Sequence, residues 1–166
     1  MRRFFPLVLV VALVLPAAAW AALGTSASSG DGTLVVDNGN GRVTVRARGG
    51  ILGRFDTGNV VISDLDVTDG RVPVVYGAET IRFLGNGRIL YSGEDVRFRM
   101  IGGLYRVQIS ATGIDISAVG RGYAVLDATG YTDFPGRFSL DGEPFQTLPG
   151  HTTTYTLGQA PAQPAK

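Results

Sequence analysis

The chain has 166 residues, of which 45% are hydrophobic and 17% are charged, so it can bury the core of one globular domain. It contains no cysteine, which excludes disulfides, thiolate metal sites and a cysteine nucleophile. The formal net charge of +1 is too close to neutral for the chain as a whole to imply a polyanionic partner.

The first 21 residues have the pattern of a secretory signal peptide. Met1-Arg2-Arg3 gives a basic start, residues 4–15 are apolar, and Ala19 and Ala21 form a small-residue exit. We therefore expect a cleavable signal helix, cut after Ala21, and a secreted, periplasmic or cell-envelope protein. An uncleaved anchor is the alternative, but the apolar run is short for a spanning helix, and we expect no transmembrane span after cleavage. Removing two of the 15 basic residues leaves 13 against 14 acidic ones, so any basic surface must be local.

The rest of the chain divides into a lead-in, one domain and a tail. Residues 22–32 are mostly small and polar and predict a flexible lead-in, and residues 158–166 predict a disordered tail. Between them, residues 33–157 alternate short apolar runs with turn signals and show no helical stripe. This pattern predicts an all-β domain, an antiparallel β-sandwich or barrel of about ten short strands. A β-solenoid is the alternative fold, because glycine recurs at fairly even intervals, although no strict repeat is present.

The first strands are predicted to form hairpins. Residues 33–36 and 42–48 flank Asp37-Asn38-Gly39-Asn40-Gly41, which has the composition of a tight turn. Gly49-Gly50 allows a bend or bulge, and residues 56–59 predict a turn into the next strand. Asp64 to Pro73 is polar and predicts the longest loop.

The second half of the domain continues this pattern around a central hairpin. Residues 80–84 and 88–91 are joined by a Gly-Asn-Gly turn, and the central hairpin runs from Glu94 to Ala111. Its Gly102-Gly103 turn would pair Met100 with Tyr105, Phe98 with Val107 and Val96 with Ile109, all on one buried face. After residue 111 the alternation changes parity, which predicts a bulge or a corner. Later strands are expected at residues 114–118, 123–127, 137–140, 144–148 and, at an edge, 152–157.

Arg97, Arg99 and Arg106 are predicted to share the outer face of this hairpin. Neighbouring strands could extend the group through Arg46, Arg48, Arg82 and Arg88. Guanidinium groups arranged in this way favour an anionic envelope polymer or a glycan as partner. A solvated face, neutralised by Glu94 or Asp95, is the simpler interpretation, and binding is the functional hypothesis. We expect no nucleic-acid partner, because the aromatic residues of the hairpin fall on its apolar face.

Asp64, Asp66 and Asp69 form the best candidate for a metal site. Closely spaced aspartates in a loop that ends at Gly70 could converge their oxygens on calcium. The third aspartate is displaced from the EF-hand spacing and the closing glutamate is missing. A solvated loop is the simpler interpretation, and the calcium site is the functional hypothesis.

No stretch carries a catalytic motif, and His151 is the only histidine. We therefore expect a non-enzymatic protein without a cofactor, with a structural or binding role at the cell envelope or outside the cell. The alternatives are a ligand- or glycan-binding barrel, which needs a cavity, and a secreted glycan hydrolase, which needs two converging carboxylates.

Overall fold

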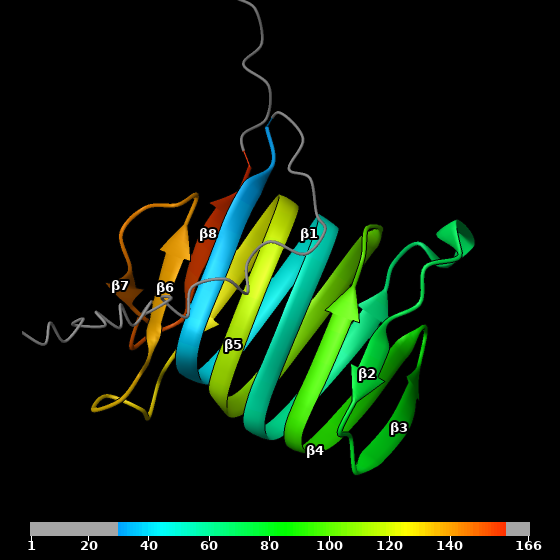
Figure 1. Cartoon of the computed structure of the whole chain (residues 1–166), viewed down its shortest axis with the longest axis horizontal. Coiled ribbons are helices and arrows are strands. Elements are labelled where there is room, and N and C mark those ends of the chain that lie inside the picture. The colour runs from blue at the N-terminus through cyan, green and yellow to red at the C-terminus, as the bar shows by residue number, and fades with distance from the viewer. Residues whose placement is uncertain (1–29, 159–166) are drawn as a thin grey trace, which may run out of the picture.

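The computed structural model describes residues 30–158, which form a single open antiparallel sheet (Figure 1). Its strands are β1 (Gly32–Asp64), β2 (Val74–Tyr76), β3 (Thr80–Gly85), β4 (Arg88–Met100), β5 (Leu104–Asp127), β6 (Arg137–Leu140), β7 (Gln146–Thr147) and β8 (Thr153–Leu157); a 3-10 turn, η1 (Val67–Asp69), follows β1. The all-β prediction is confirmed, but the expected set of about ten short strands is wrong, because residues 30–158 form eight strands, of which β1 has 33 residues and β5 has 24. The signal helix, most of the lead-in and the tail from residue 159 lie outside the described residues. Within residues 30–158, no helix has the length and apolar character to cross a bilayer.

β1 and β5 wind around each other as a flat coil. Val45 of β1 pairs with Val107 on one side and with Ala124, 17 residues further along β5, on the other. Arg46 likewise pairs with both Arg106 and Tyr123. One turn of the coil therefore takes 17 residues, and each strand has successive turns of its partner on its two sides.

β4 and β5 together form the second strand of this coil. Met100 of β4 pairs with Ile51, and Leu104 of β5 pairs with Arg48, so both run antiparallel to β1 on the same side of it. The chain does not reverse between them. Residues 32–64 and 88–127 are thus the two arms of one long hairpin that is wound into a coil.

The arms bend at two edges of the molecule and so form two layers, which Figure 1 shows as front and back. The pairing places residues 33–40, 50–57, 94–100 and 113–119 in the front layer with β2 and β6. Residues 42–48, 59–64, 88–92, 104–110 and 121–127 lie in the back layer with β3 and β8. Apolar side chains from both layers pack between them as one core.

Glycines mark the bends of β1. Gly41, Gly49 and Gly58 follow one another at intervals of eight and nine residues, about half of one turn of the coil. A Cβ atom at Gly49 would lie 2.0 Å from the carbonyl oxygen of Val119, and one at Gly58 would lie 2.4 Å from that of Ser110. Because a side chain cannot fit at such distances, the strands can cross from one layer to the other this closely only at glycine.

Three predicted connections are wrong for one reason. Gly102-Gly103 is a bulge between β4 and β5 and not a hairpin turn, since β1 takes the place of the predicted partner strand. The segments at residues 37–41 and 56–59 lie within β1 and bend it without reversing it. Gly, Asn and Asp suit a bend in a continuous strand as well as a reversal, so their composition does not distinguish the two.

Other predictions are confirmed. The faces of the central stretch are as expected, with Val96, Phe98, Met100, Tyr105, Val107 and Ile109 each at most 3% exposed. The turn at residues 85–87 joins β3 to β4, the edge strand β8 is present, and the register of β5 shifts near residue 111. A closed barrel is wrong because the sheet is open, and a parallel solenoid is wrong because every strand pair in residues 30–158 is antiparallel.

Candidate functional site

The structure does not bring the three predicted arginines together. Arg97 and Arg99 lie in the front layer, where they pair with Arg54 and Leu52 of β1. Arg106 lies in the back layer, opposite Arg46. The bulge at Gly102-Gly103 carries the chain from one layer to the other, so side chains on either side of it point to opposite surfaces of the molecule.

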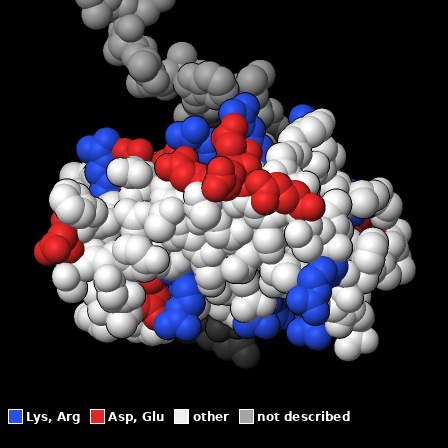
Figure 2. Space-filling view, turned by 90° about the horizontal axis from the view of Figure 1, so that it is seen from below, with Lys and Arg blue, Asp and Glu red and all other residues white. Residues whose placement is uncertain are grey.

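Most arginines of the front layer have carboxylate partners. Arg97 Nη2 lies 2.9 Å from Asp95 Oδ2, and Arg54 Nε donates to Asp115 Oδ2 at 2.8 Å. This hydrogen bond and the charge of Asp115 raise the pKa of Arg54. Figure 2, which views the lower edge of Figure 1, shows charged groups of both signs on either side of an uncharged strip. The front layer is therefore close to locally neutral.

The back layer carries an uncompensated group of arginines on consecutive strands. Arg46 pairs with Arg106, Arg106 pairs with Ser63, and Ser63 pairs with Arg88. We call these four residues the arginine row. With strands about 4.8 Å apart, the row spans roughly 14 Å.

The three guanidinium groups of the arginine row are exposed. In the described part of the chain, none of them lies within 4.0 Å of a carboxylate. Like charges placed directly opposite each other on neighbouring strands destabilise a sheet. A bound anion would remove this cost.

Ser63 adds an unused polar group to the row. Its side chain lies between the strands of Arg106 and Arg88, and only 3% of the residue is exposed. Within residues 30–158, its hydroxyl group has no hydrogen-bond partner. A buried hydroxyl that is left unpaired costs free energy.

A shallow depression of about 470 Å³ lies at the upper end of this surface. It is lined by Asp31, Arg48, Gly49, Asp69, Arg71, Gly102, Gly103 and Arg121. Arg48 of β1 pairs with Arg121 of β5, two residues along from the pair formed by Arg46 and Tyr123. The depression therefore continues the surface that carries the arginine row. Its arginines are partly neutralised, because Arg121 Nε lies 3.0 Å from Asp31 Oδ1 and Arg48 Nη2 lies 3.6 Å from Asp66 Oδ2.

The aspartates of the predicted calcium loop are all engaged with protein groups, two of them with the local backbone. Asp64 accepts a hydrogen bond from the amide of Asp66 at 2.9 Å, and Asp69 accepts one from the amide of Arg71 at 2.9 Å. Asp66 accepts one from Thr68 Oγ1 and also pairs with Arg48. Within residues 30–158, no three His, Cys, Asp or Glu residues are placed to hold a metal ion together. Calcium binding stays a prediction from the sequence.

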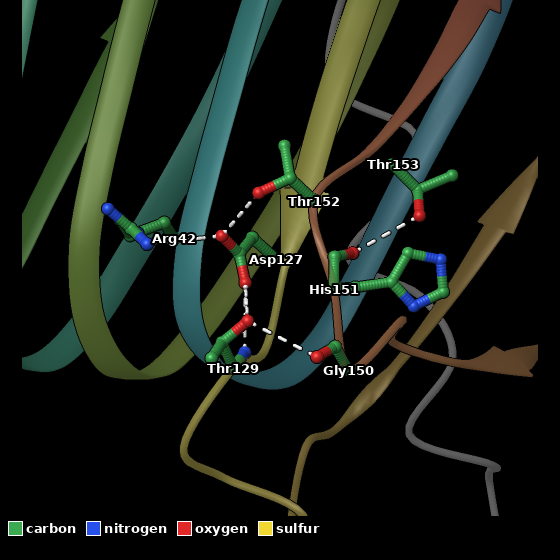
Figure 3. A network of polar contacts seen from close by, with 7 residues as sticks. All are labelled: Arg42, Asp127, Thr129, Gly150, His151, Thr152 and Thr153. Carbon is green, nitrogen blue, oxygen red and sulfur yellow. Dashed lines mark hydrogen bonds and ion pairs between the residues drawn. The ribbon is translucent and has the colours of Figure 1, made fainter.

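Sequence reasoning missed a polar cluster around Asp127 at the end of β5 (Figure 3). Its nearly buried carboxylate accepts hydrogen bonds from the side chain and backbone of Thr129 and from Thr152 Oγ1, and lies 3.2 Å from Arg42 Nη2. The hydrogen bonds from Thr129, followed by that from Thr152, lower the pKa of Asp127 to about 2. The sequence Asp127-Ala128-Thr129 is compatible with a hydrogen bond from Thr129 to Asp127, but it does not predict the hydrogen bond from Thr152.

This cluster ties the segment before β8 to the end of β5. Its contacts join residues 127 and 129 to residues 150 and 152, and the ring of His151 points away from Asp127 (Figure 3). The imidazole therefore does not share a hydrogen bond with the buried carboxylate. The geometry indicates a clamp that holds the chain at a corner of the coil.

A comparison with protein-family models, curated proteins and solved structures finds no match for this chain.

Proposed function

We propose that this protein is a non-enzymatic binding module of the cell envelope or the cell exterior, and that the arginine row holds an anionic polymer. The proposal rests on one observation. Arg46 and Arg106 lie opposite each other on neighbouring strands, exposed and without a carboxylate partner in residues 30–158.

The arrangement suits a polymer better than a small ligand. The row is open and follows the flat back layer across four strands, whereas small-molecule sites are concave and largely enclosed. Guanidinium groups present planar donors that match carboxylate and phosphate groups. Successive charged groups along a polymer would each meet one arginine.

The proposed compartment rests on the leader. Residues 1–21 have the basic start, apolar middle and small-residue exit of a secretory signal. An exported protein meets the carboxylated and phosphorylated polymers of the envelope, which supply anions of the required kind.

Binding to defined polymers tests the proposal. We expect the purified protein to bind polygalacturonate or polyphosphate, with neutral dextran as the negative probe, and we expect added salt to weaken this binding. The double variant R46A/R106A should lose about 10-fold in affinity or more, equivalent to about 1.4 kcal/mol.

Arg99→Ala is the matched control. Arg99 is exposed and has no carboxylate within 4.0 Å in residues 30–158, but it lies in the front layer beside Leu52 and Val74. This variant should bind as the unmodified protein does. Equal losses in both variants, or no binding to either polymer, would overturn the proposal. A preference for single-stranded DNA over both polymers would assign the row to nucleic acid instead.

A further inference from the structure

The back layer ends at β3, a strand with a free edge. β3 pairs with β4 and, in the described part of the chain, with no other strand. All six of its residues are exposed. Natural proteins often protect such an edge with charged side chains, proline or a β-bulge; β3 has Arg82 and a register shift before Gly85, but no lysine, no proline and no charge on its core-facing side.

The core-facing side of β3 continues the hydrophobic core into solvent. Phe83 pairs with Ile89, which pairs with Ile62 of the core. Exposure rises along this line, from 1% at Ile62 to 81% at Phe83. Ile81, next to Tyr91, is 55% exposed on the same side. An added strand with the same alternation would complete this end of the core.

Strand direction decides which strand could be added. β3, β1 and β8 all run in one direction, because each step in the order β3-β4-β1-β5-β8 is antiparallel. If the free edge β8 of another copy docked head to tail, it would meet β3 in parallel. A two-fold axis perpendicular to the layer instead pairs β3 with β3 of a second copy in antiparallel fashion, as everywhere else in this sheet.

One register of this self-pairing fits the side chains well. If Phe83 lies opposite the partner's Phe83, then Arg82 lies opposite the partner's Leu84 and Ile81 lies opposite the partner's Gly85. The register centred on Arg82 would set two guanidinium groups against each other, which is unfavourable. The Phe83 register is therefore preferred.

Charges at the two ends of β3 complement each other in this arrangement. Glu79 precedes β3, and Arg88 follows the turn after it. Both are exposed, and neither forms an ion pair within residues 30–158. Antiparallel pairing brings the start of each strand to the end of its partner, so Glu79 comes to the same end of the seam as the partner's Arg88.

We propose that β3 is a dimerisation edge, at which two copies of this chain join their back layers into one continuous antiparallel sheet. The two arginine rows then lie on one surface, related by the two-fold axis. This inference does not depend on polymer binding, because it rests on the edge strand, its exposed apolar side and its charges.

The absence of cysteine allows a direct test of the register. Phe83→Cys places one thiol per chain on the two-fold axis, so mild oxidation of the purified protein should give a covalent dimer. Phe134→Cys is the matched control, because Phe134 is 80% exposed but lies in the loop before β6. It should cross-link far less. Equal cross-linking of the two variants would overturn the proposal.

Sedimentation equilibrium tests the dimer without a cross-link. We expect the unmodified protein and F134R to be dimeric and F83R to be a folded monomer, with a lower melting temperature because it lacks the stabilisation by dimerisation. R88E should weaken the dimer, and the double variant E79R/R88E should restore it. A monomer at all concentrations, or a dimer that survives F83R, would overturn the proposal. If F83R unfolds the protein, the charge-swap pair still decides the question.

Discussion

Arg46 and Arg106 lie directly opposite each other on neighbouring strands of the back layer, and neither has a carboxylate partner in residues 30–158. A pair of this kind costs stability in the free protein, as is common where a surface is kept for binding. We expect Arg46→Glu to replace repulsion by attraction to Arg106 and to stabilise the fold by about 0.2–1 kcal/mol.

The measurement is urea unfolding at low and high salt, combined with polymer binding. The gain in the free energy of unfolding should shrink at high salt, because both side chains are exposed. Polymer binding should fall in the same variant. A variant that lost both stability and binding would show that Arg46 supports the fold and does not mark a binding surface.

The bends of the coil make a second prediction, at Gly49. A Cβ atom there would lie 2.0 Å from the carbonyl oxygen of Val119, on a neighbouring strand. We expect Gly49→Ala to destabilise the protein by about 1–3 kcal/mol, because the strands must move apart. Gly150→Ala is the control, since a Cβ atom at Gly150 meets no atom within 4 Å, and its effect should stay within about 0.5 kcal/mol. Chemical denaturation of both variants compares the two losses.

Period-two alternation was sufficient to predict which side chains are buried, but not which strands pair. Phe98 and Val107 both face the core as predicted, but they do not pair with each other. Phe98 pairs with Gly53 of β1, and Val107 pairs with Val45 and Ile62 of β1. Alternation depends only on the local strand, whereas pairing depends on the coil. The spacing of Gly41, Gly49 and Gly58 was the visible sign of the coil, because the intervals between them are each about half a turn.

The candidate site was predicted in its residue type and only partly in its grouping. Arg46 and Arg88 were suggested as an extension of the basic stripe, and they do lie in one row with Arg106. Arg97 and Arg99 do not, because the bulge at Gly102-Gly103 sends them to the other layer. The order of these arginines across the strands follows from the 17-residue offset between successive turns of the coil. No local pattern in the sequence predicts this offset.

The leader makes a third prediction, which separates cleavage from anchoring. When the full chain is expressed in a bacterium, we expect the mature protein to begin at Ala22, because the small residues at 19 and 21 fit the cleavage site. Intact mass and N-terminal sequencing of the exported protein measure this directly. Ala19→Arg together with Ala21→Arg should block cleavage. A mature protein that still begins at Met1 and sediments with membranes would support the anchor instead.

Tyr105 makes a fourth prediction about the core. Its hydroxyl group is buried and donates a hydrogen bond to the carbonyl oxygen of Gly50 at 3.1 Å, and burial raises the pKa of Tyr105. Tyr105→Phe removes this buried hydrogen bond, which should cost about 0.5–1.5 kcal/mol. Tyr131→Phe, at an exposed position, should change stability little. Thermal unfolding of both variants distinguishes a lost buried hydrogen bond from a general effect of removing a hydroxyl group.

Asp127 makes the last prediction, on the dependence of stability on pH. Its pKa falls from 3.8 to about 2 in the folded protein, chiefly because Thr129 and then Thr152 donate hydrogen bonds to the charged carboxylate. A carboxylate with a lowered pKa stabilises the fold above its unfolded pKa, and this contribution is lost as the pH falls from about 4 to about 2. Asp127→Asn should therefore be less stable than the unmodified protein at pH 7, and the difference should narrow below pH 4. Asp133→Asn, in the next loop, controls for loss of an exposed charge. Acid titration of the unfolding free energy measures all three proteins, and a difference that stays constant from pH 7 to pH 2 would show that the hydrogen bonds do not depend on the charge.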